Sequence, residues 1–183
     1  MAFVARALIP TGPWTVDDLD DFPEGTGVRY ELIDGALLVS AEPSLQHQRV
    51  TRLLMRVLED SAPEAFEVFL PIDVRLSPLR QIAPDITVVR RVDAEGRRLA
   101  GRPVLVVEVQ SPSTRAVDLT LKRQVLQDAR VPSYWLVDPE QLTIRVLEVD
   151  DGEYVERGTA VVGQPLALST PWPMSLDAAA LAR

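Results

Sequence analysis

The six residues VLVVEV, at positions 104–109, restrict the fold of this chain more than any other segment. An apolar run of this length, rich in valine, predicts a strand that is buried on both faces of a sheet. Glu108 lies inside the run, and Gln110 follows two residues later. Burying an ionised carboxylate is costly unless it is paired or bound to a metal. We therefore expect Glu108 to belong to a functional site.

The rest of the chain predicts helices mixed with strands. Apolar residues recur at helical spacing over 44–60, where Ser44 can cap the helix, and over 115–129. The other expected elements are a short acidic helix starting near Thr15, a hairpin turning at Asp34-Gly35, and strands over 66–77, 82–90, 103–109, 133–139, 143–150 and 153–161. This order predicts an α/β or mixed α+β fold, in which helices pack against a central sheet.

Length, composition and charge narrow the class of protein. A chain of 183 residues is long enough for one domain, which we expect to span residues 1–183. Cysteine is absent, so disulfides and thiolate metal sites are excluded, and no apolar run approaches a membrane span; we expect a cytoplasmic protein. The net charge of −8 argues against a surface that binds nucleic acid all over, although nine of the nineteen basic residues lie between Arg90 and Arg130.

The alternation of side chains along a strand places a second carboxylate near Glu108. Glu108 and Gln110 project from the same face of their strand. Asp85 follows Pro84 within the expected strand 82–90. If the two strands are neighbours, their acidic side chains can lie opposite each other within roughly 5 Å. Two carboxylates that close repel each other unless a cation lies between them.

A divalent cation and a nearby amine would complete such a site. Mg²⁺ binds one or two carboxylates together with water and phosphate oxygens, and it can activate a bound water for hydrolysis. Arg115, Asp118 and Lys122 recur at helical spacing, beside an apolar stripe that includes Leu121. Lys122 could therefore reach the site, or it could form an ordinary surface ion pair with Asp118.

Several motifs occur in an order that resembles a known family. The chain contains YELIDG at 30–35, PD at 84–85, EVQSPST at 108–114 and VPSYWLVDP at 131–139. Together they resemble the bacterial putative restriction endonuclease family of the PD-(D/E)xK nuclease superfamily. This resemblance implies a restriction-endonuclease-like fold with a mixed central sheet, and cleavage of DNA that depends on Mg²⁺, or on Mn²⁺ in its place. By analogy with such nucleases, we also expect a homodimer.

The resemblance assigns roles to individual positions. Asp85 and Glu108 match the residues that hold the metal. Gln110 stands where the superfamily pattern has lysine, and Lys122 matches a lysine that has moved to the following helix. Glu31, in the YELIDG hairpin, would be a further acidic residue of the site.

Three positions depart from the family pattern. Arg130 replaces the usual glycine, Leu126 a tyrosine and Ser133 a glutamate. None of them is an expected metal ligand, so the departures concern dimer contacts or the end of the helix. A glycine at position 130 would serve as the helix C-cap.

Other residues with chemical potential have simpler interpretations. His47, the only histidine, borders the apolar stripe of its helix, which favours a satisfied histidine at the edge of the core over a general base. Tyr134 and Trp135 are expected in the core, and Trp14 and Trp172 are expected to cover the sheet.

Two functional alternatives to a nuclease remain open. The missing lysine at position 110 and the acidic charge are compatible with a nuclease-like fold that no longer cleaves and instead binds nucleic acid or protein. A structural protein that self-associates through its later strands is the third hypothesis.

Overall fold

The structure, a computed structural model, describes residues 12–22, 28–41, 43–96, 98–112 and 115–182. Its strands are β1 (Val28–Ile33), β2 (Ala36–Ala41), β3 (Phe66–Phe69), β4 (Val74–Ser77), β5 (Arg80–Ile82), β6 (Ile86–Arg90), β7 (Leu99–Ala100), β8 (Leu105–Val109), β9 (Ser133–Asp138), β10 (Thr143–Asp150), β11 (Glu153–Ala160), β12 (Leu166–Leu168) and β13 (Met174–Leu176). Its helical elements are α1 (Leu45–Ser61), α2 (Arg115–Val117), α3 (Arg123–Asp128), the 3₁₀ turns η1 (Asp18–Asp21), η2 (Arg91–Asp93) and η4 (Ala178–Ala182), and the π-helical turn η3 (Asp118–Lys122).

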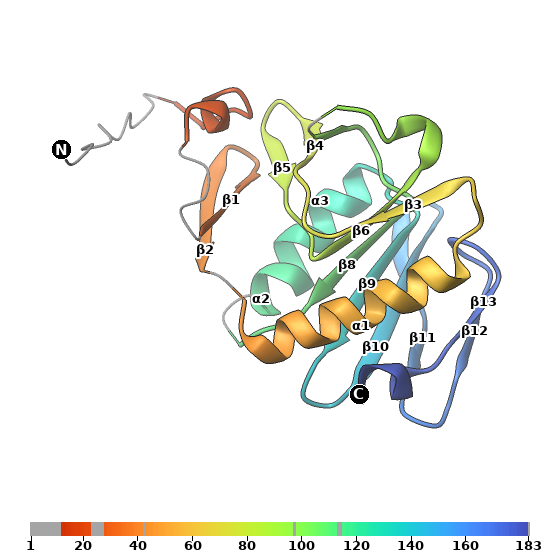
Figure 1. The fold of residues 1–183 in the computed structure, drawn as a ribbon. Coiled ribbons are helices and arrows are strands. Elements are labelled where there is room, and N and C mark those ends of the chain that lie inside the picture. Colours follow the sequence, from red (N-terminus) through yellow and green to blue (C-terminus); the bar gives the residue numbers. More distant parts are fainter. Residues whose placement is uncertain (1–11, 23–27, 42, 97, 113–114, 183) are drawn as a thin grey trace.

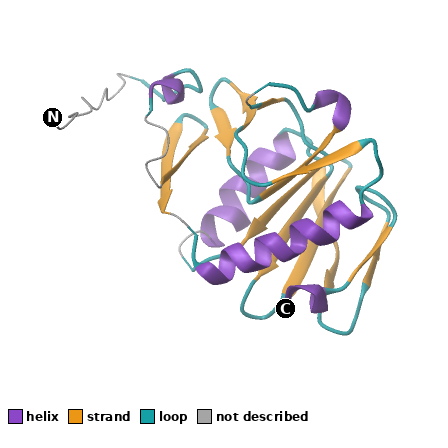
Figure 2. Cartoon of the chain, viewed as in Figure 1, coloured by secondary structure: helices purple, strands orange, loops and turns teal. Residues whose placement is uncertain are grey.

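A six-stranded sheet lies at the centre of the fold, with the strand order β11-β10-β9-β8-β6-β3. Strands β8 and β9 run parallel, and their other neighbours run antiparallel, so the sheet is mixed. Helix α1 crosses one face of this sheet, and α2 and α3 lie on the other (Figures 1 and 2). The predicted mixed sheet flanked by helices is confirmed. A second sheet has the order β2-β1-β5-β4-β7, and β12 pairs with β13.

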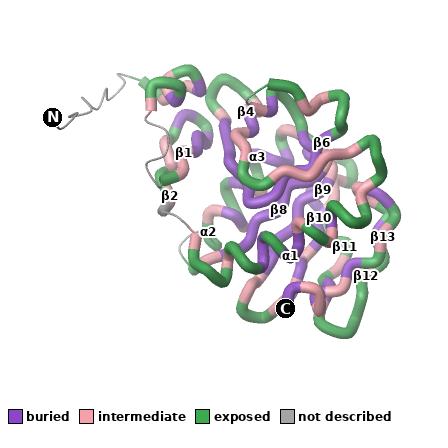
Figure 3. Tube along the Cα trace, viewed as in Figure 1, coloured by how far each residue is buried: buried purple, intermediate pink, exposed green. Residues whose placement is uncertain are grey.

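Strand β8 is buried on both faces, as predicted (Figure 3). Leu105, Val107 and Val109 pack in the core under α1, whereas Val106 packs with Leu126 of α3 on the opposite face. This alternation fixes the direction of Glu108, which projects on the same face as Val106. The carboxylate therefore points toward the layer of α2, η3 and α3.

The ends of two elements match their sequence signals. The Ser44 side chain accepts a hydrogen bond from the backbone N–H of His47 and so caps α1. The turn between β1 and β2 is formed by Asp34 and Gly35, both with positive φ, as the Asp-Gly pair predicted. Turn η1 confirms the short acidic helix, although its predicted end at residues 23–27 lies outside the described residues.

Two predicted strands are broken in the structure. Segment 66–77 divides into β3 and β4, because the chain leaves the six-stranded sheet after Phe69 and joins the second sheet at Val74. Segment 82–90 divides at Pro84, which has no backbone N–H to donate to a neighbouring strand. Asp85 was predicted to lie inside this strand. In the structure it lies directly before β6. The break leaves its side chain at the end of the sheet.

The predicted helix 115–129 contains a π-helical turn, η3, between α2 and α3. The wider turn changes which side chains face the sheet. Leu121, expected in the apolar stripe, is 47% exposed, whereas Lys122 is only 5% exposed. The prediction for Leu121 was therefore wrong. Turns of this kind are frequent at functional sites.

Most aromatic residues take the places expected from sequence. Tyr134 and Trp135 are fully buried in β9, and Trp172 packs against Phe66 over the sheet. Trp14 packs instead in a small cluster against the β1–β2 hairpin. Strands β12 and β13 follow the last predicted element and had no signal that we recognised. Within the described residues, no helix combines the length and apolar character needed to cross a membrane.

Arg130 follows the end of α3 with a positive φ of 54°. This left-handed conformation costs a residue with a Cβ atom about 1–2 kcal/mol and is the usual place of a C-cap glycine. We expect Arg130→Gly to raise the free energy of unfolding by about 1 kcal/mol, measured by urea denaturation. Arg130→Ala, which keeps the Cβ atom, is the matched control. An equal gain in both variants would show that backbone strain is not the cause.

Candidate active site

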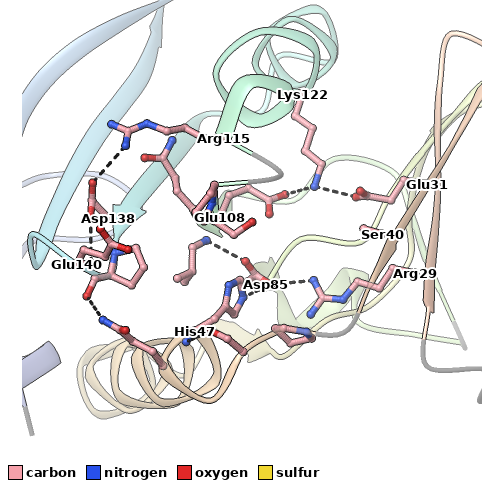
Figure 4. A pocket seen from close by; sticks show the side chains of 18 of the residues that line it. Arg29, Glu31, Ser40, His47, Asp85, Glu108, Arg115, Lys122, Asp138 and Glu140 are labelled. Atoms are coloured by element: carbon pink, nitrogen blue, oxygen red, sulfur yellow. Dashed lines mark hydrogen bonds and ion pairs between the residues drawn. The ribbon is translucent and has the colours of Figure 1, made fainter.

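A cleft of 620 Å³ opens where β8 ends and β6 begins. Its walls come from the β1–β2 hairpin, the start of α1, turn η3 and the β9–β10 connection (Figure 4). All five side chains predicted from sequence line this cleft: Glu31, Asp85, Glu108, Gln110 and Lys122. Each of the five is at most 5% exposed, so the cleft brings buried polar groups together.

Asp85 and Glu108 lie at the adjoining ends of the neighbouring strands β6 and β8. Ile86 pairs with Val107 in the antiparallel ladder, so the next positions toward the cleft are Asp85 and Glu108. The backbone N–H of Val109 donates to Oδ2 of Asp85 over 2.8 Å, which ties this carboxylate to the end of β8. Both carboxylates thus line the same cleft, and the charge of Asp85 raises the pKa of Glu108.

Lys122 is enclosed by three carboxylates. Its Nζ lies 2.9 Å from Oε1 of Glu31, 2.9 Å from Oε1 of Glu108 and 3.7 Å from Oδ1 of Asp118. Glu31 also accepts a hydrogen bond from the backbone N–H of Ala83. This buried cluster excludes the surface ion pair that we had considered for Lys122 and Asp118.

Lys122 is also the only lysine of the chain, since the other eighteen basic residues are arginines. Arginine is bulkier and planar, whereas the lysine ammonium is compact and can donate in three directions. The chain uses lysine at this position and nowhere else, which is a sequence signal that the residue has a specific role.

Burial and charge set the ionisation of this cluster. Burial raises the pKa of Glu108 well above its ordinary value, and the carboxylates of Asp85, Asp118 and Glu31 raise it further, against the effect of Lys122. Burial by itself would lower the pKa of Lys122, but the surrounding carboxylates raise it overall. The three carboxylates thus favour the ammonium form of Lys122 in this cluster.

Two residues that sequence analysis did not assign to the site hold Asp85. Nη1 of Arg29 donates to Oδ1 of Asp85 over 2.8 Å. Nε2 of His47 lies 2.9 Å from the same oxygen, within ion-pair distance, although the ring is not oriented for a linear hydrogen bond. Burial alone would raise the pKa of Asp85, yet the contacts with His47 and Arg29 lower it overall. Asp85 is thus ionised.

His47, interpreted from the sequence as a histidine at the edge of the core, also lines the cleft and contacts Asp85. The period of α1 predicts its faces, but it does not show that the start of the helix meets the end of β6. Arg29 carried a usable signal. It lies two residues before Glu31 in β1, and residues two apart project from the same face of a strand.

The donor set suits a hard divalent cation. Four buried carboxyl groups (Glu31, Asp85, Glu108 and Asp118) outnumber the cationic side chains that contact them, Arg29 and Lys122. Oε2 of Glu108 accepts no hydrogen bond from the described residues. Among these residues, no three His, Asp or Glu side chains could enclose a metal ion unaided. A cation would thus rely on Asp85, Glu108, water and substrate oxygens, a shell typical of Mg²⁺.

Gln110 reaches the cleft from the same strand end. Its backbone N–H donates to the carbonyl of Val137, and its side chain is buried. Nε2 of Gln110 has no hydrogen-bond partner in the described part of the chain. A buried amide without a partner is costly, so this position fits a group that meets a ligand or an ordered water.

The mixed central sheet flanked by helices, with buried carboxylates at the adjoining ends of β6 and β8, is the arrangement expected of a restriction-endonuclease-like fold. The Uma2 family, described as "Putative restriction endonuclease", matches residues 16–180. The chain belongs to this family, which confirms the resemblance seen in its motifs.

A solved structure has the same fold. The crystal structure of a "putative nuclease belonging to DUF820" from Anabaena variabilis superposes with a TM-score of 0.70 at 20% sequence identity. The match covers 92% of this chain and 97% of that one, which confirms the predicted fold class. No curated protein matches the sequence.

Proposed function

We propose that this protein is a Mg²⁺-dependent endonuclease that hydrolyses phosphodiester bonds of DNA. The observation that carries the proposal is the pair of buried carboxylates, Asp85 and Glu108, at the adjoining ends of β6 and β8, with the only lysine of the chain 2.9 Å from Glu108. Membership of a family described as restriction endonucleases supports the same reaction.

We assign a separate role in this reaction to each of the five side chains. Asp85 and Glu108 hold Mg²⁺, or Mn²⁺ in its place, which when bound polarises the phosphodiester and lowers the pKa of a coordinated water. The Lys122 ammonium stabilises negative charge that develops at the phosphate. Glu31 positions Lys122 through its contact with Nζ. Gln110 would offer its side-chain amide, whose Nε2 has no partner among the described residues, to a phosphate oxygen or to the attacking water.

Removal of the metal tests this proposal. We expect the purified protein to nick or linearise plasmid DNA in the presence of Mg²⁺ or Mn²⁺. Cleavage should stop in EDTA and return when excess Mg²⁺ is added. The measurement is the loss of supercoiled plasmid on agarose gels. Equal cleavage in EDTA would rule out a metal-dependent enzyme.

One observation favours the alternative of a binding module that does not cleave. Both expected metal ligands already contact cationic side chains, Lys122 at Glu108 and Arg29 at Asp85. Such a module would bind DNA in EDTA, with an affinity that falls steeply as salt increases. Calorimetry that shows no Mn²⁺ binding would favour the binding module, because the nuclease requires the cation.

We also propose that the protein acts as a homodimer, in which two active sites cut the two DNA strands. Strand β11 forms one edge of the six-stranded sheet and could pair with a second copy of itself. Sedimentation equilibrium would then give twice the 20.2 kDa mass of one chain.

A further inference from the structure

The cationic side chains of the cleft differ in how firmly they are held. Lys122 contacts three carboxylates and is almost fully buried. Arg115 lies at the rim, half exposed, 3.6 Å from Asp138. Arg29 lies between these extremes, because its side chain is 26% exposed while its guanidinium touches the buried Asp85. Arg29 thus contacts a proposed metal ligand and lines the cleft with a side chain that is more exposed than that of Lys122.

Arg29 has unused capacity for hydrogen bonding. Only its Nη1 atom has a partner within the described residues, the carboxylate of Asp85. A guanidinium presents five N–H donors in a planar fork, which matches the spacing of two phosphate oxygens. Its remaining donors are therefore free to meet an anion in the cleft.

A bound cation and Arg29 would compete for the same carboxylate. Oδ2 of Asp85 already accepts from the backbone of Val109, so Arg29 and His47 both contact Oδ1. A divalent cation on Asp85 would place two further positive charges beside the guanidinium, and like charges this close repel. The same cation would attract a phosphodiester, which supplies a new anionic partner for Arg29.

We propose, on the basis of the nuclease function above, that Arg29 is a phosphate-binding residue that changes partners. In the cation-free protein it neutralises Asp85. Once a cation occupies Asp85 and Glu108, Arg29 turns to a non-bridging oxygen of the DNA phosphodiester. Arg29 thus compensates the charge of Asp85 in the absence of the metal and binds the substrate phosphate in its presence. Its position on β1 would couple the hairpin to substrate binding.

This exchange predicts effects of opposite sign on two ligands when Arg29 is replaced by methionine. Mn²⁺ binding, measured by calorimetry without DNA, should become about two- to fivefold tighter, because a partly exposed competing ion pair is lost. DNA binding, measured by fluorescence anisotropy with Ca²⁺ in place of Mg²⁺, should weaken about tenfold, because a charge-assisted hydrogen bond is lost. A residue that only supports the fold would weaken both.

Two further variants sharpen the test. Arg29→Lys keeps the competing charge and loses the planar fork, so Mn²⁺ binding should stay near that of the unmodified protein while DNA binding weakens. Arg91→Met is the matched control, since Arg91 pairs with Glu67 at the opposite end of β6, and neither affinity should change. Thermal unfolding shows that each variant is folded.

The outcomes separate this inference from the nuclease function. Opposite shifts in Arg29→Met support the exchange even if the unmodified protein binds Mn²⁺ and DNA without cutting, a result that would reject only the nuclease activity. Weaker binding of both ligands, or unchanged DNA binding, overturns the role of Arg29. Absence of Mn²⁺ binding to the unmodified protein overturns both proposals.

Discussion

Asp85→Asn and Glu108→Gln are each expected to lower Mg²⁺-dependent DNA cleavage by about 10³-fold, because the cation contributes several kcal/mol to the transition state. Each change removes one charged ligand and keeps the shape of the side chain. The measurement is the initial rate of plasmid nicking at saturating Mg²⁺. Asp93→Asn, which removes a carboxylate paired with Arg90 outside the cleft, is the control and should cleave normally.

The same two variants should differ in stability when no metal is present. The pKa of Glu108 is raised, so its ionised form costs stability as the pH rises, and Glu108→Gln removes that cost. The pKa of Asp85 is lowered, so its ionised form contributes stability that is lost as the pH falls. At pH 8 we expect a lower melting temperature for Asp85→Asn and an equal or higher one for Glu108→Gln. Full cleavage by either folded variant would remove that residue from the metal site.

Lys122→Met is expected to lower the free energy of unfolding by about 3–5 kcal/mol at pH 8, because it leaves buried carboxylates without their cation. Glu31, Glu108 and Asp118 all contact the lost ammonium. Protonation relieves their repulsion, so the loss should shrink as the pH falls toward 5, in the direction set by the raised pKa of Glu108. Urea denaturation at both pH values measures the difference.

A second substitution shows whether charge is the cause. Adding Glu31→Gln to Lys122→Met removes one of the uncompensated carboxylates and should restore part of the lost stability at pH 8. If the ammonium mattered only through its packing, the loss would be the same at both pH values. Glu31→Gln would then give no recovery.

The two carboxylates proposed to hold the metal could be picked out from the sequence because their positions follow from local rules. Glu108 stands out in a strand that is otherwise apolar, and Asp85 lies opposite it as soon as β6 and β8 are neighbours. Helical spacing and the family motifs predicted that Lys122 could reach the site, but they did not predict that it would be buried. Turn η3 directs the Lys122 side chain into the cleft. We recognised no residue pattern that predicts a π-helical turn.

The contacts of Asp85 could not be predicted, although the strand period places Arg29 on the face of Glu31, because the contacting residues come from distant segments. Arg29 and His47 reach one oxygen from the β1–β2 hairpin and from the start of α1. Periodicity gives the face on which each side chain lies, but not which ends of the elements meet in space. The break at Pro84 shows the same difficulty, since an apolar run predicted one strand where the chain passes between two sheets.

The most direct test of the account uses the single lysine as a probe. Labelling with ¹⁵N-lysine gives one side-chain ammonium resonance, that of Nζ in Lys122. If Asp85 and Glu108 share a divalent cation, paramagnetic Mn²⁺ should broaden this resonance, excess Mg²⁺ should restore it, and Glu108→Gln should abolish the broadening. A Lys122 resonance that stays sharp at Mn²⁺ concentrations that support cleavage would place the metal elsewhere.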